Sequence, residues 1–238
     1  MEQISGNNAI IELLENDPSK VERVIVEKGF KSDKIGTVIH LCRKKKVRFD
    51  VIPDLASYAS KGKGCIAIIK EYRYFDLDET DWNYTDSAVI LDEIEDPHNL
   101  GAIIRSAAAA GFDLVIIPER NCASVTEAVI NVSAGTVYKI KIARVKNIAA
   151  AIMRLKKEGF WITGTDMKGN ADYTDYDFTD RAAVVIGNES RGMRKLVKEK
   201  CDDIVRIELS NGVESLNASV AAALVLFERK KKKISLLP

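Results

Sequence analysis

Short apolar segments alternate with segments of helical periodicity from residue 88 onward, and this alternation limits the fold more than any other feature. Strands are predicted over Ala88–Ile94, Leu114–Pro118, Tyr138–Ala143, Trp161–Asp166, Ala183–Gly187 and Ile204–Leu209. Helices are predicted over Leu100–Ala110, Val125–Val132, Asn147–Lys157, Arg191–Lys200 and Asn217–Lys232. Strands that are apolar on both faces belong in a parallel sheet that helices cover on both sides. The predicted class is therefore α/β with a mainly parallel sheet, whose ligands bind beyond the carboxyl ends of the strands.

The N-terminal part of the chain forms a second, smaller pattern. It predicts helices over Asn8–Glu15 and Ile35–Lys44 and strands over Val21–Glu27, Val47–Ile52 and Cys65–Ile69. The segment Arg73–Tyr84 that follows is acidic and aromatic and lacks steady periodicity, which indicates a linker that docks on a neighbouring surface. We therefore expect a small α/β domain over 1–72, a linker over 73–86 and a larger domain over 87–238.

Composition argues against several classes of protein. Hydrophobic residues make up 46% and charged residues 30% of the chain, and the net charge of +1 neither predicts nor excludes a nucleic-acid partner. The N-terminus lacks a signal-peptide pattern, and no uncharged apolar run approaches the roughly 20 residues of a membrane span. The four cysteines are scattered and only two histidines are present, so no zinc site is predicted. We expect a cytoplasmic protein with reduced thiols.

The loop after the first strand of the larger pattern, Asp96–Gly101, carries the first group of polar residues. Asn99 is a natural N-cap for the helix that follows. Arg105 lies on that helix with only glycine and alanine three and four residues away, so no acidic helix neighbour can neutralise its guanidinium. Such an arginine either forms an ion pair with a carboxylate elsewhere in the fold or binds an anion.

Two later loops follow apolar strands in the same way. Gly187–Gly192 begins with a glycine that allows a ligand to approach the backbone, and helix capping does not account for its Glu189 and Arg191. Ser210–Asn217 precedes an apolar helix and carries more polar side chains than a turn and an N-cap require. Because all three loops leave the carboxyl ends of predicted strands, they are expected to converge on one polar site.

Several common enzyme signatures are missing from the sequence. No G-x-G-x-x-G follows the first strand of the parallel sheet, and no P-loop G-x-x-x-x-G-K-[ST] occurs. Two histidines provide no credible Ser-His-Asp set, and no carboxylate cluster suggests a metal. From residue patterns alone, the chain is an α/β enzyme or binding protein with a polar site built by three loops.

The three loops carry longer motifs that can be compared with known families. The motifs span Asp96–Ala107, Val185–Met193, and Ile207–Leu209 with Ser215–Ala221. In this order and at these spacings, they resemble the three signature motifs of the SpoU (TrmH-type) family of RNA ribose methyltransferases. Near the N-terminus, Ser5–Leu14 and Gly64–Ala67 are similar to the substrate-binding domain of the branch that acts on 23S ribosomal RNA (RlmB-like). The resemblance thus covers nearly the whole chain.

The resemblance implies a fold, a reaction and a set of site residues. The fold is a trefoil-knotted α/β methyltransferase domain, preceded by an L30e-like RNA-binding domain and paired as a homodimer through the catalytic domain. The reaction is 2′-O-ribose methylation of large-subunit ribosomal RNA, on a guanosine of 23S RNA, with S-adenosyl-L-methionine as methyl donor and no metal. By carry-over, the donor-binding positions are Gly187, Ile207, Leu216 and Asn217. The catalytic positions are Asn99, Arg105, Glu189, Ser215 and Asn217.

The matching residues support a mechanism for Arg105. We interpret it as a clamp on the neighbouring phosphate that also stabilises negative charge on the 2′-oxygen, because a guanidinium pKa above about 12 disfavours a role as base. Asn99 would orient Arg105 or the ribose, while Glu189, Ser215 and Asn217 shape the pocket. Three alternatives stay open: a transfer-RNA ribose methyltransferase, a non-catalytic RNA-binding or ribosome-assembly paralogue, and a small-molecule α/β enzyme, which leaves the N-terminal domain unexplained.

Basic residues outside the motifs have two interpretations. Arg43–Lys46, with Lys61 and Lys63, either contact RNA phosphates or are solvated surface side chains. The run Arg229–Lys233 is interpreted as a solvated helix end that complements the helix dipole, in preference to an RNA contact.

Overall fold

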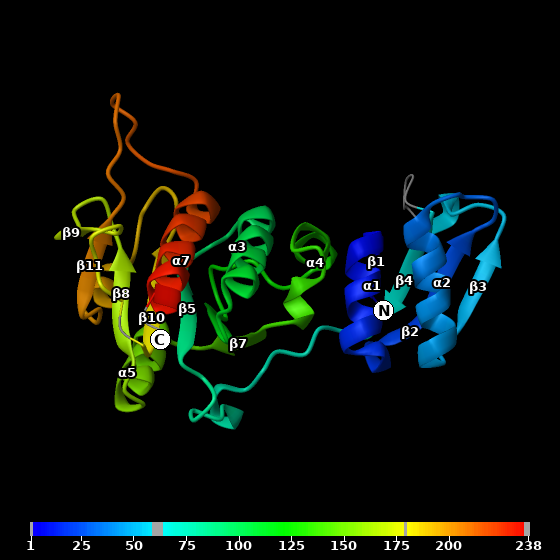
Figure 1. Cartoon of the computed structure of the whole chain (residues 1–238), viewed down its shortest axis with the longest axis horizontal. Coiled ribbons are helices and arrows are strands. Elements are labelled where there is room, and N and C mark those ends of the chain that lie inside the picture. The colour runs from blue at the N-terminus through cyan, green and yellow to red at the C-terminus, as the bar shows by residue number, and fades with distance from the viewer. Residues whose placement is uncertain (1, 59–63, 179, 236–238) are drawn as a thin grey trace. The chain divides into compact units, whose positions relative to one another are not determined.

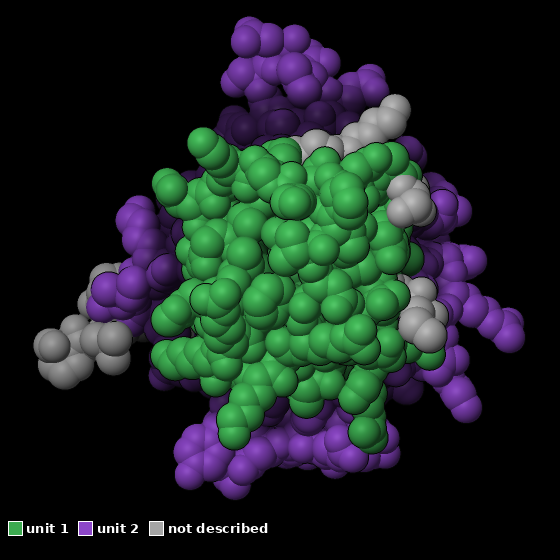
Figure 2. All heavy atoms as spheres, turned by 90° about the vertical axis from the view of Figure 1, so that its right-hand side faces the viewer, with its two compact units in different colours: residues 1–73, 125–139 green, residues 74–124, 140–238 purple. Residues whose placement is uncertain are grey.

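A computed structural model describes residues 2–58, 64–178 and 180–235, so Lys61 and Lys63 lie outside the described residues. The chain divides into two compact units, Met1–Arg73 with Val125–Lys139 and Tyr74–Ser124 with Ile140–Pro238. Figure 2 colours these two units separately. In the described ranges, every helix is too short or too polar to cross a bilayer.

The first unit contains a mixed sheet and two long helices. Its elements are β1 (Glu2–Ile4), α1 (Asn7–Asn16), β2 (Val21–Glu27), α2 (Asp33–Lys45), β3 (Phe49–Ile52) and β4 (Cys65–Ile69), with 3-10 turns at Pro18–Lys20 and Ala56–Tyr58. The sheet order is β1-β4-β2-β3, in which β4 runs antiparallel to β1 and β2 while β2 and β3 are parallel. The predicted helices and strands of this region are confirmed. Strand β1 was not predicted, because three residues are too few to show alternation.

The segment Val125–Lys139 belongs to the first unit, although the larger domain expected over 87–238 includes it. It contains α4 (Glu127–Val132) and a 3-10 turn at Thr136–Tyr138. The backbone N–H of Gly6 donates to Asn131 Oδ1 at 2.9 Å. Gly135, at φ 85°, lies so near α1 that a Cβ there would come within 2.8 Å of the Ala9 Cα. Close backbone packing therefore joins this segment to residues that are distant in the sequence.

The second unit is built on a parallel sheet. Its strands are β5 (Ser87–Asp92), β6 (Leu114–Pro118), β7 (Lys141–Val145), β8 (Trp161–Thr165), β9 (Ala171–Asp172), β10 (Ala182–Gly187) and β11 (Asp203–Arg206). Its helices are α3 (Pro97–Ala110), α5 (Ile148–Lys157), α6 (Lys195–Lys198) and α7 (Ala218–Ser235), with a 3-10 turn at Leu77–Glu79. The order is β7-β6-β5-β10-β8-β11-β9, and each described pair of neighbours is parallel.

Helices cover both faces of this sheet. Ile90 of β5 and Val185 of β10 belong to a buried cluster with Ile152 of α5. Because successive strand residues point to opposite faces, Val89 and Val184 face the other side, where they are fully buried and α7 packs against α3 and β10. Figure 1 shows α7 in red next to α3. The predicted α/β class with a mainly parallel sheet is confirmed.

Residues 74–86 dock on the second unit, in agreement with their acidic and aromatic composition. The backbone N–H of Phe75 donates to the carbonyl of Ile142 at 2.9 Å. The Trp82 ring meets the Phe160 ring edge-on, with centroids 5.9 Å apart. Aromatic side chains thus anchor the segment to the sheet and its helices.

Several predicted elements of the larger region are shorter in the structure, and two of the differences have a clear cause. The strand predicted from Tyr138 begins at Lys141, because Tyr138 ends the 3-10 turn of the first unit. The helix predicted over Arg191–Lys200 is reduced to α6. The chain first makes a tight loop in which Asn188 and Gly192 exchange backbone hydrogen bonds of 3.2 and 2.9 Å, and Gly192 adopts φ 66°. A left-handed residue breaks helical geometry at that point.

The basic run at the end of α7 is not the solvated helix end that the sequence predicts. Arg229 is 2% exposed, and its guanidinium donates to the Asp180 carbonyl at 2.8 Å and lies 3.5 Å from the Asp86 carboxylate. Lys233 Nζ contacts the same carboxylate at 2.7 Å. Residues four apart share one helix face, so Arg229 and Lys233 turn toward the sheet together.

Candidate functional site

A cavity of about 680 Å³ lies where the loops after β8, β10 and β11 meet. Residues 165–168, 186–192 and 214–216 line it, with Ile207, Leu209, Ala218 and Ala221. Strand β8 lies between β10 and β11 in the sheet, so all these loops leave neighbouring strands at their carboxyl ends. This is the edge where parallel sheets bind their ligands.

The structure brings most of the predicted site residues to this cavity. The predicted residues that line it are Gly187, Glu189, Ile207, Ser215 and Leu216. They come from the second and third loops. Asn99, Arg105 and Asn217 are not among the lining residues, and their places are described next.

A chain of side-chain hydrogen bonds links all three loops. Asn99 of α3 is only 7% exposed, and its Nδ2 donates to Glu189 Oε1. Asn217 Nδ2 donates to Asn99 Oδ1 at 2.9 Å. Asn99 therefore uses its amide as a donor to the second loop and as an acceptor from the third. Because both ends of this buried amide are satisfied, the three loops are held in one arrangement.

The N-cap of α3 differs from the prediction. Asp96, not Asn99, is the capping residue, and its carboxylate accepts a hydrogen bond of 2.9 Å from the His98 N–H. Pro97 occupies the first helical position, where its missing N–H has no cost. Since Asp96 caps the helix, the Asn99 side chain is left to join the loops.

Arg105 lies on the exposed face of α3. Its guanidinium has no ion-pair or hydrogen-bond partner in the part of the chain that the structure describes. The internal ion pair that the sequence left open is therefore not formed with any described residue. An unpartnered, solvated guanidinium is available to an external anion.

The structure explains why position 187 requires a glycine, which the sequence did not reveal. A Cβ at this position would lie 2.4 Å from the backbone N of Met193, so the loop itself approaches Gly187 closely. The prediction that this glycine makes room for a ligand is thus incomplete. The absence of a side chain first allows residues 187–193 to fold back on themselves.

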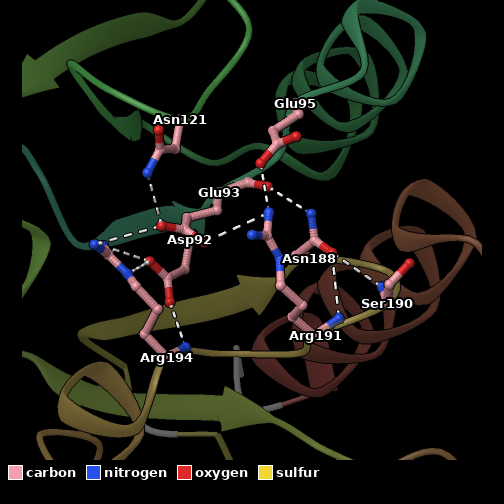
Figure 3. A network of polar contacts seen from close by, with 8 residues as sticks. All are labelled: Asp92, Glu93, Glu95, Asn121, Asn188, Ser190, Arg191 and Arg194. Atoms are coloured by element: carbon pink, nitrogen blue, oxygen red, sulfur yellow. Dashed lines mark hydrogen bonds and ion pairs between the residues drawn. The ribbon is translucent and has the colours of Figure 1, made fainter.

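The second loop is also tied to the end of β5 by ion pairs, which Figure 3 shows. Asp92 is fully buried and accepts hydrogen bonds from Arg194 N at 2.7 Å and Arg194 Nε at 2.8 Å. Glu93 adopts φ 62°, a left-handed conformation that costs a residue with a side chain on the order of 1 kcal/mol. Its carbonyl accepts a hydrogen bond of 2.9 Å from Asn188 Nδ2. Local backbone strain at Glu93 thus accompanies the attachment of the second loop.

Arg191 completes this network on the solvent side. It forms an ion pair with Glu95, and its guanidinium lies 3.7 Å from the Glu93 carboxylate. Asn188 Oδ1 accepts hydrogen bonds from the backbone N–H groups of Ser190 and Arg191, at 3.0 and 3.2 Å. Asn188 therefore shapes the loop internally, and the N-cap position of α6 is Arg194.

Sequence reasoning missed the contribution of the β8 loop. Asp166 lines the cavity, and its carboxylate contacts Lys198 Nζ at 2.8 Å. Burial raises the pKa of Asp166, but the hydrogen bond from Lys198 and the Lys168 backbone N–H outweigh it and hold the pKa below its usual range. The sequence analysis predicted a strand that ends at Asp166, and this position at the carboxyl end of a strand could have indicated a site residue. The position of β8 between β10 and β11 was not predictable from the sequence.

The cysteines of the second unit do not act as nucleophiles in this arrangement. Burial raises the pKa of the Cys201 thiol and of the Cys122 thiol to about 12. The thiolate is the reactive form of cysteine, and at neutral pH both groups are protonated. Among the described residues, no cluster of histidine, cysteine and carboxylate side chains is suited to hold a metal ion.

The sequence of the second unit is similar to a described protein family. Residues 86–227 match the SpoU rRNA Methylase family. A protein of Bacillus subtilis (strain 168), named as the TrmH family tRNA/rRNA methyltransferase YacO, is 35% identical over 238 residues. The similarity covers 97% of this chain and 95% of that relative.

Solved structures with a similar fold cover this chain to different extents. The SpoU methyltransferase AviRb from Streptomyces viridochromogenes, in complex with AdoMet, is 25% identical with a TM-score of 0.82, covering 98% of this chain and 90% of that one. The A. aeolicus TrmH/SpoU tRNA modifying enzyme is 26% identical with a TM-score of 0.58, covering 63% of this chain and 77% of that one. The first likeness extends over both units, and the second over a smaller part of the chain.

Proposed function

The chain belongs to the SpoU rRNA methylase family, and from that premise we propose that it transfers the methyl group of S-adenosyl-L-methionine to a ribose 2′-oxygen of RNA. The observation that carries the proposal is the buried Asn99 amide, which joins Glu189 and Asn217 beside the cavity. A volume of about 680 Å³ is within the range of roughly 300–1,000 Å³ that is typical of small-molecule sites.

The residues of the cavity fit the chemistry of this donor. Gly187, Ile207 and Leu216 would hold it, as the motif positions imply, and Asn217 would fix the third loop around it. Apolar side chains suit a purine ring, while loop backbone groups suit the polar ribose and amino-acid parts. When bound, the donor supplies an electrophilic methyl carbon on a sulfonium, and the transfer requires alignment and one proton acceptor but no metal. AviRb, the solved relative, contains AdoMet.

Arg105 would act on the RNA. Its unpartnered guanidinium would bind the phosphate next to the reactive ribose and stabilise negative charge that develops on the 2′-oxygen. The 2′-oxygen would form its bond to the methyl carbon as the carbon–sulfur bond of the donor breaks and S-adenosylhomocysteine leaves, and the hydroxyl proton would pass to that phosphate or to water. Glu189 and Ser215 would shape the ribose side of the cavity. The trefoil knot that the resemblance implies stays a prediction.

The finer substrate proposal is a guanosine of 23S ribosomal RNA. The family is described as one of rRNA methylases. The A. aeolicus tRNA modifying enzyme covers only 63% of this chain, whereas an additional N-terminal unit is present here. Arg43, Lys44 and Lys46 are exposed near the end of α2 and would contact RNA phosphates. Replacing all three by glutamine is expected to weaken RNA binding without changing donor binding.

We also propose that the catalytic units pair as a homodimer through α7. Val220, Leu224 and Phe227 share the outer face of this helix and are 49%, 37% and 44% exposed. The opposite face, with Ala222 and Leu226, is fully buried. Sedimentation analysis should show a dimer that Phe227→Glu dissociates. A wild-type protein that sediments as a monomer at micromolar concentration contradicts this assembly.

The central experiment compares ribosomal RNA from cells with and without the active protein and maps 2′-O-methyl groups. Loss of one modified position in 23S RNA, restored by the wild-type protein and not by Arg105→Ala, is the expected result. Loss of a methyl group from transfer RNA instead would assign the tRNA alternative. An unchanged methylation map, with no heat on titration of S-adenosyl-L-methionine, would identify a non-catalytic paralogue and overturn the proposal.

A further inference from the structure

Arg191 has the most exposed side chain among the charged residues of the Figure 3 network. It lines the cavity, yet its side chain is 61% exposed. Its partner Glu95 is 55% exposed, so both ends of this ion pair are in contact with water. An ion pair between two exposed side chains contributes only about 0–1 kcal/mol. A stronger anion can therefore replace Glu95.

Arg194, in the same loop, provides the contrast. Its guanidinium lies 2.6 Å from the carboxylate of Asp92, which is fully buried. The backbone N–H of Arg194 donates to the same carboxylate at 2.7 Å. Although the Arg194 side chain is 46% exposed, its departure would leave the buried Asp92 charge without compensation, so this pair cannot exchange freely. Arg194 fixes the loop, whereas the Arg191 side chain is free to change partners.

The backbone of Arg191 is held independently of its side chain. Its N–H donates to Asn188 Oδ1 at 3.2 Å, and Asn188 Nδ2 donates to the Glu93 carbonyl at 2.9 Å. Gly192 N–H bonds back to the Asn188 carbonyl at 2.9 Å. Because these bonds do not involve the guanidinium, that group can leave Glu95 without moving the loop or the Glu189 side chain.

We propose that Arg191 is a substrate contact that binds a backbone phosphate of the RNA, and that Glu95 holds the same guanidinium when no RNA is present. The inference rests on the proposed function, since it requires RNA to lie across the cavity. Guanidinium binds phosphate through paired N–H···O bonds, which gives it an advantage over a single exposed carboxylate contact. Glu95 thus competes with the substrate, and its removal should strengthen RNA binding.

The test measures binding of an unmodified transcript of 23S ribosomal RNA, in the presence of S-adenosylhomocysteine, over a range of salt concentrations. Arg191→Gln is expected to raise the Kd about five- to tenfold and to reduce the salt dependence by roughly one phosphate contact. Glu95→Gln is expected to lower the Kd about two- to fivefold, the factor that corresponds to a pair contributing up to roughly 1 kcal/mol. Arg191→Lys should recover most of the salt dependence, because it keeps the charge.

A matched control removes an arginine charge elsewhere on the second unit. Arg154 pairs with Asp78 and does not line the cavity, so Arg154→Gln should change the Kd less than about twofold. Affinity for S-adenosylhomocysteine, measured by calorimetry, should stay within about twofold of wild type in every variant. This measurement detects any general damage to the loop.

The inference requires that Arg191→Gln and Glu95→Gln change the Kd for RNA in opposite directions. Equal weakening by Arg191→Gln and Glu95→Gln would show that the pair only shapes the loop, and it would overturn the inference. An unchanged Kd for Arg191→Gln would do the same. These results are independent of methyl transfer. If the two variants change the Kd for RNA in the expected directions but the wild-type protein methylates no RNA, the proposed function is refuted and the phosphate contact is still supported.

Discussion

Strand β5 carries charged residues at both ends, but the two ends use them differently. At the amino end, Asp86 accepts contacts from Arg229 at 3.5 Å and Lys233 at 2.7 Å, and these groups fasten α7 to the sheet. At the carboxyl end, the adjoining loop and helix carry Asn99 and Arg105 toward the second and third loops and toward solvent. Charge at the amino end fastens a helix to the sheet, whereas the carboxyl end combines a fixed pair, Asp92 with Arg194, with the unpartnered guanidinium of Arg105.

The difference follows from the direction of the strands. In a parallel sheet all carboxyl ends lie at one edge, so loops from separate segments converge there. The amino ends receive the returning helices, and α7 ends against them with Arg229 2% exposed. A cluster of basic residues in the sequence therefore indicates a function only when it is known whether the cluster lies at the amino or the carboxyl ends of the strands.

The largest expected effect comes from Arg105→Ala at the carboxyl end. We expect methyl transfer to fall by on the order of 1,000-fold, because a charge that stabilises the transition state is lost. The thermal midpoint should stay near that of wild type, since the guanidinium has no partner in the described chain. Single-turnover methylation and thermal denaturation check the two parts. Near-wild-type turnover would remove Arg105 from the mechanism.

Asn99→Asp sharpens the comparison by placing a carboxylate against Glu189. In the wild-type protein the Asn99 amide donates to the Glu189 carboxylate. An aspartate at position 99 would repel that carboxylate, so we expect a loss of activity of roughly 100-fold at neutral pH. Lower pH should recover part of the activity, because one shared proton restores the hydrogen bond. A pH–rate profile measures this recovery. The double variant Asn99→Asp/Glu189→Gln is the control and should lose the pH dependence.

The sequence predicted the parallel sheet because its strands are almost continuously apolar. Ala88–Leu91 and Ala183–Ile186 are buried on both faces, as their composition indicates. The motif loops were also predictable, since Asn99, Glu189 and Asn217 follow recognisable strands or precede a helix. The pattern could not predict which of these side chains form hydrogen bonds with one another, because Asn99 contacts residues that are 90 and 118 positions away in the sequence.

Other features depended on contacts that periodicity does not encode. The tight turn at Gly192 shortened the predicted helix, because its left-handed φ is a property of the loop as a whole. The burial of Arg229 overturned the prediction of a solvated helix end, because its partners Asp86 and Asp180 are remote in the chain. Local propensity identifies elements, whereas tertiary contacts decide which polar residues are structural.

At the amino end of β5, Arg229→Ala should reduce stability rather than activity. Arg229 is buried and also lies 5.1 Å from the Phe112 ring centroid, so its removal is expected to lower the free energy of unfolding by about 2 kcal/mol. Turnover per folded molecule should stay within about twofold of wild type. Urea denaturation and active-site titration measure the two quantities. A large loss of turnover in a fully folded sample would mean that the two ends of β5 are coupled.

The smallest effect concerns Asp86 and acid. Burial raises the pKa of this carboxyl, but the hydrogen bond and charge of Lys233 outweigh it, so the pKa lies below the usual 3.8. A lowered pKa in the folded state means that the stabilisation is complete above pH values near 3.8 and is lost as the pH falls through the folded value. Because Asp86 and Lys233 are 46% and 39% exposed, the contribution should be below about 1 kcal/mol. Urea denaturation from pH 3 to pH 7 should therefore show Asp86→Asn approaching wild-type stability only at the acid end. A constant difference across that range would show that the loss of stability in Asp86→Asn does not come from the charge of the carboxylate.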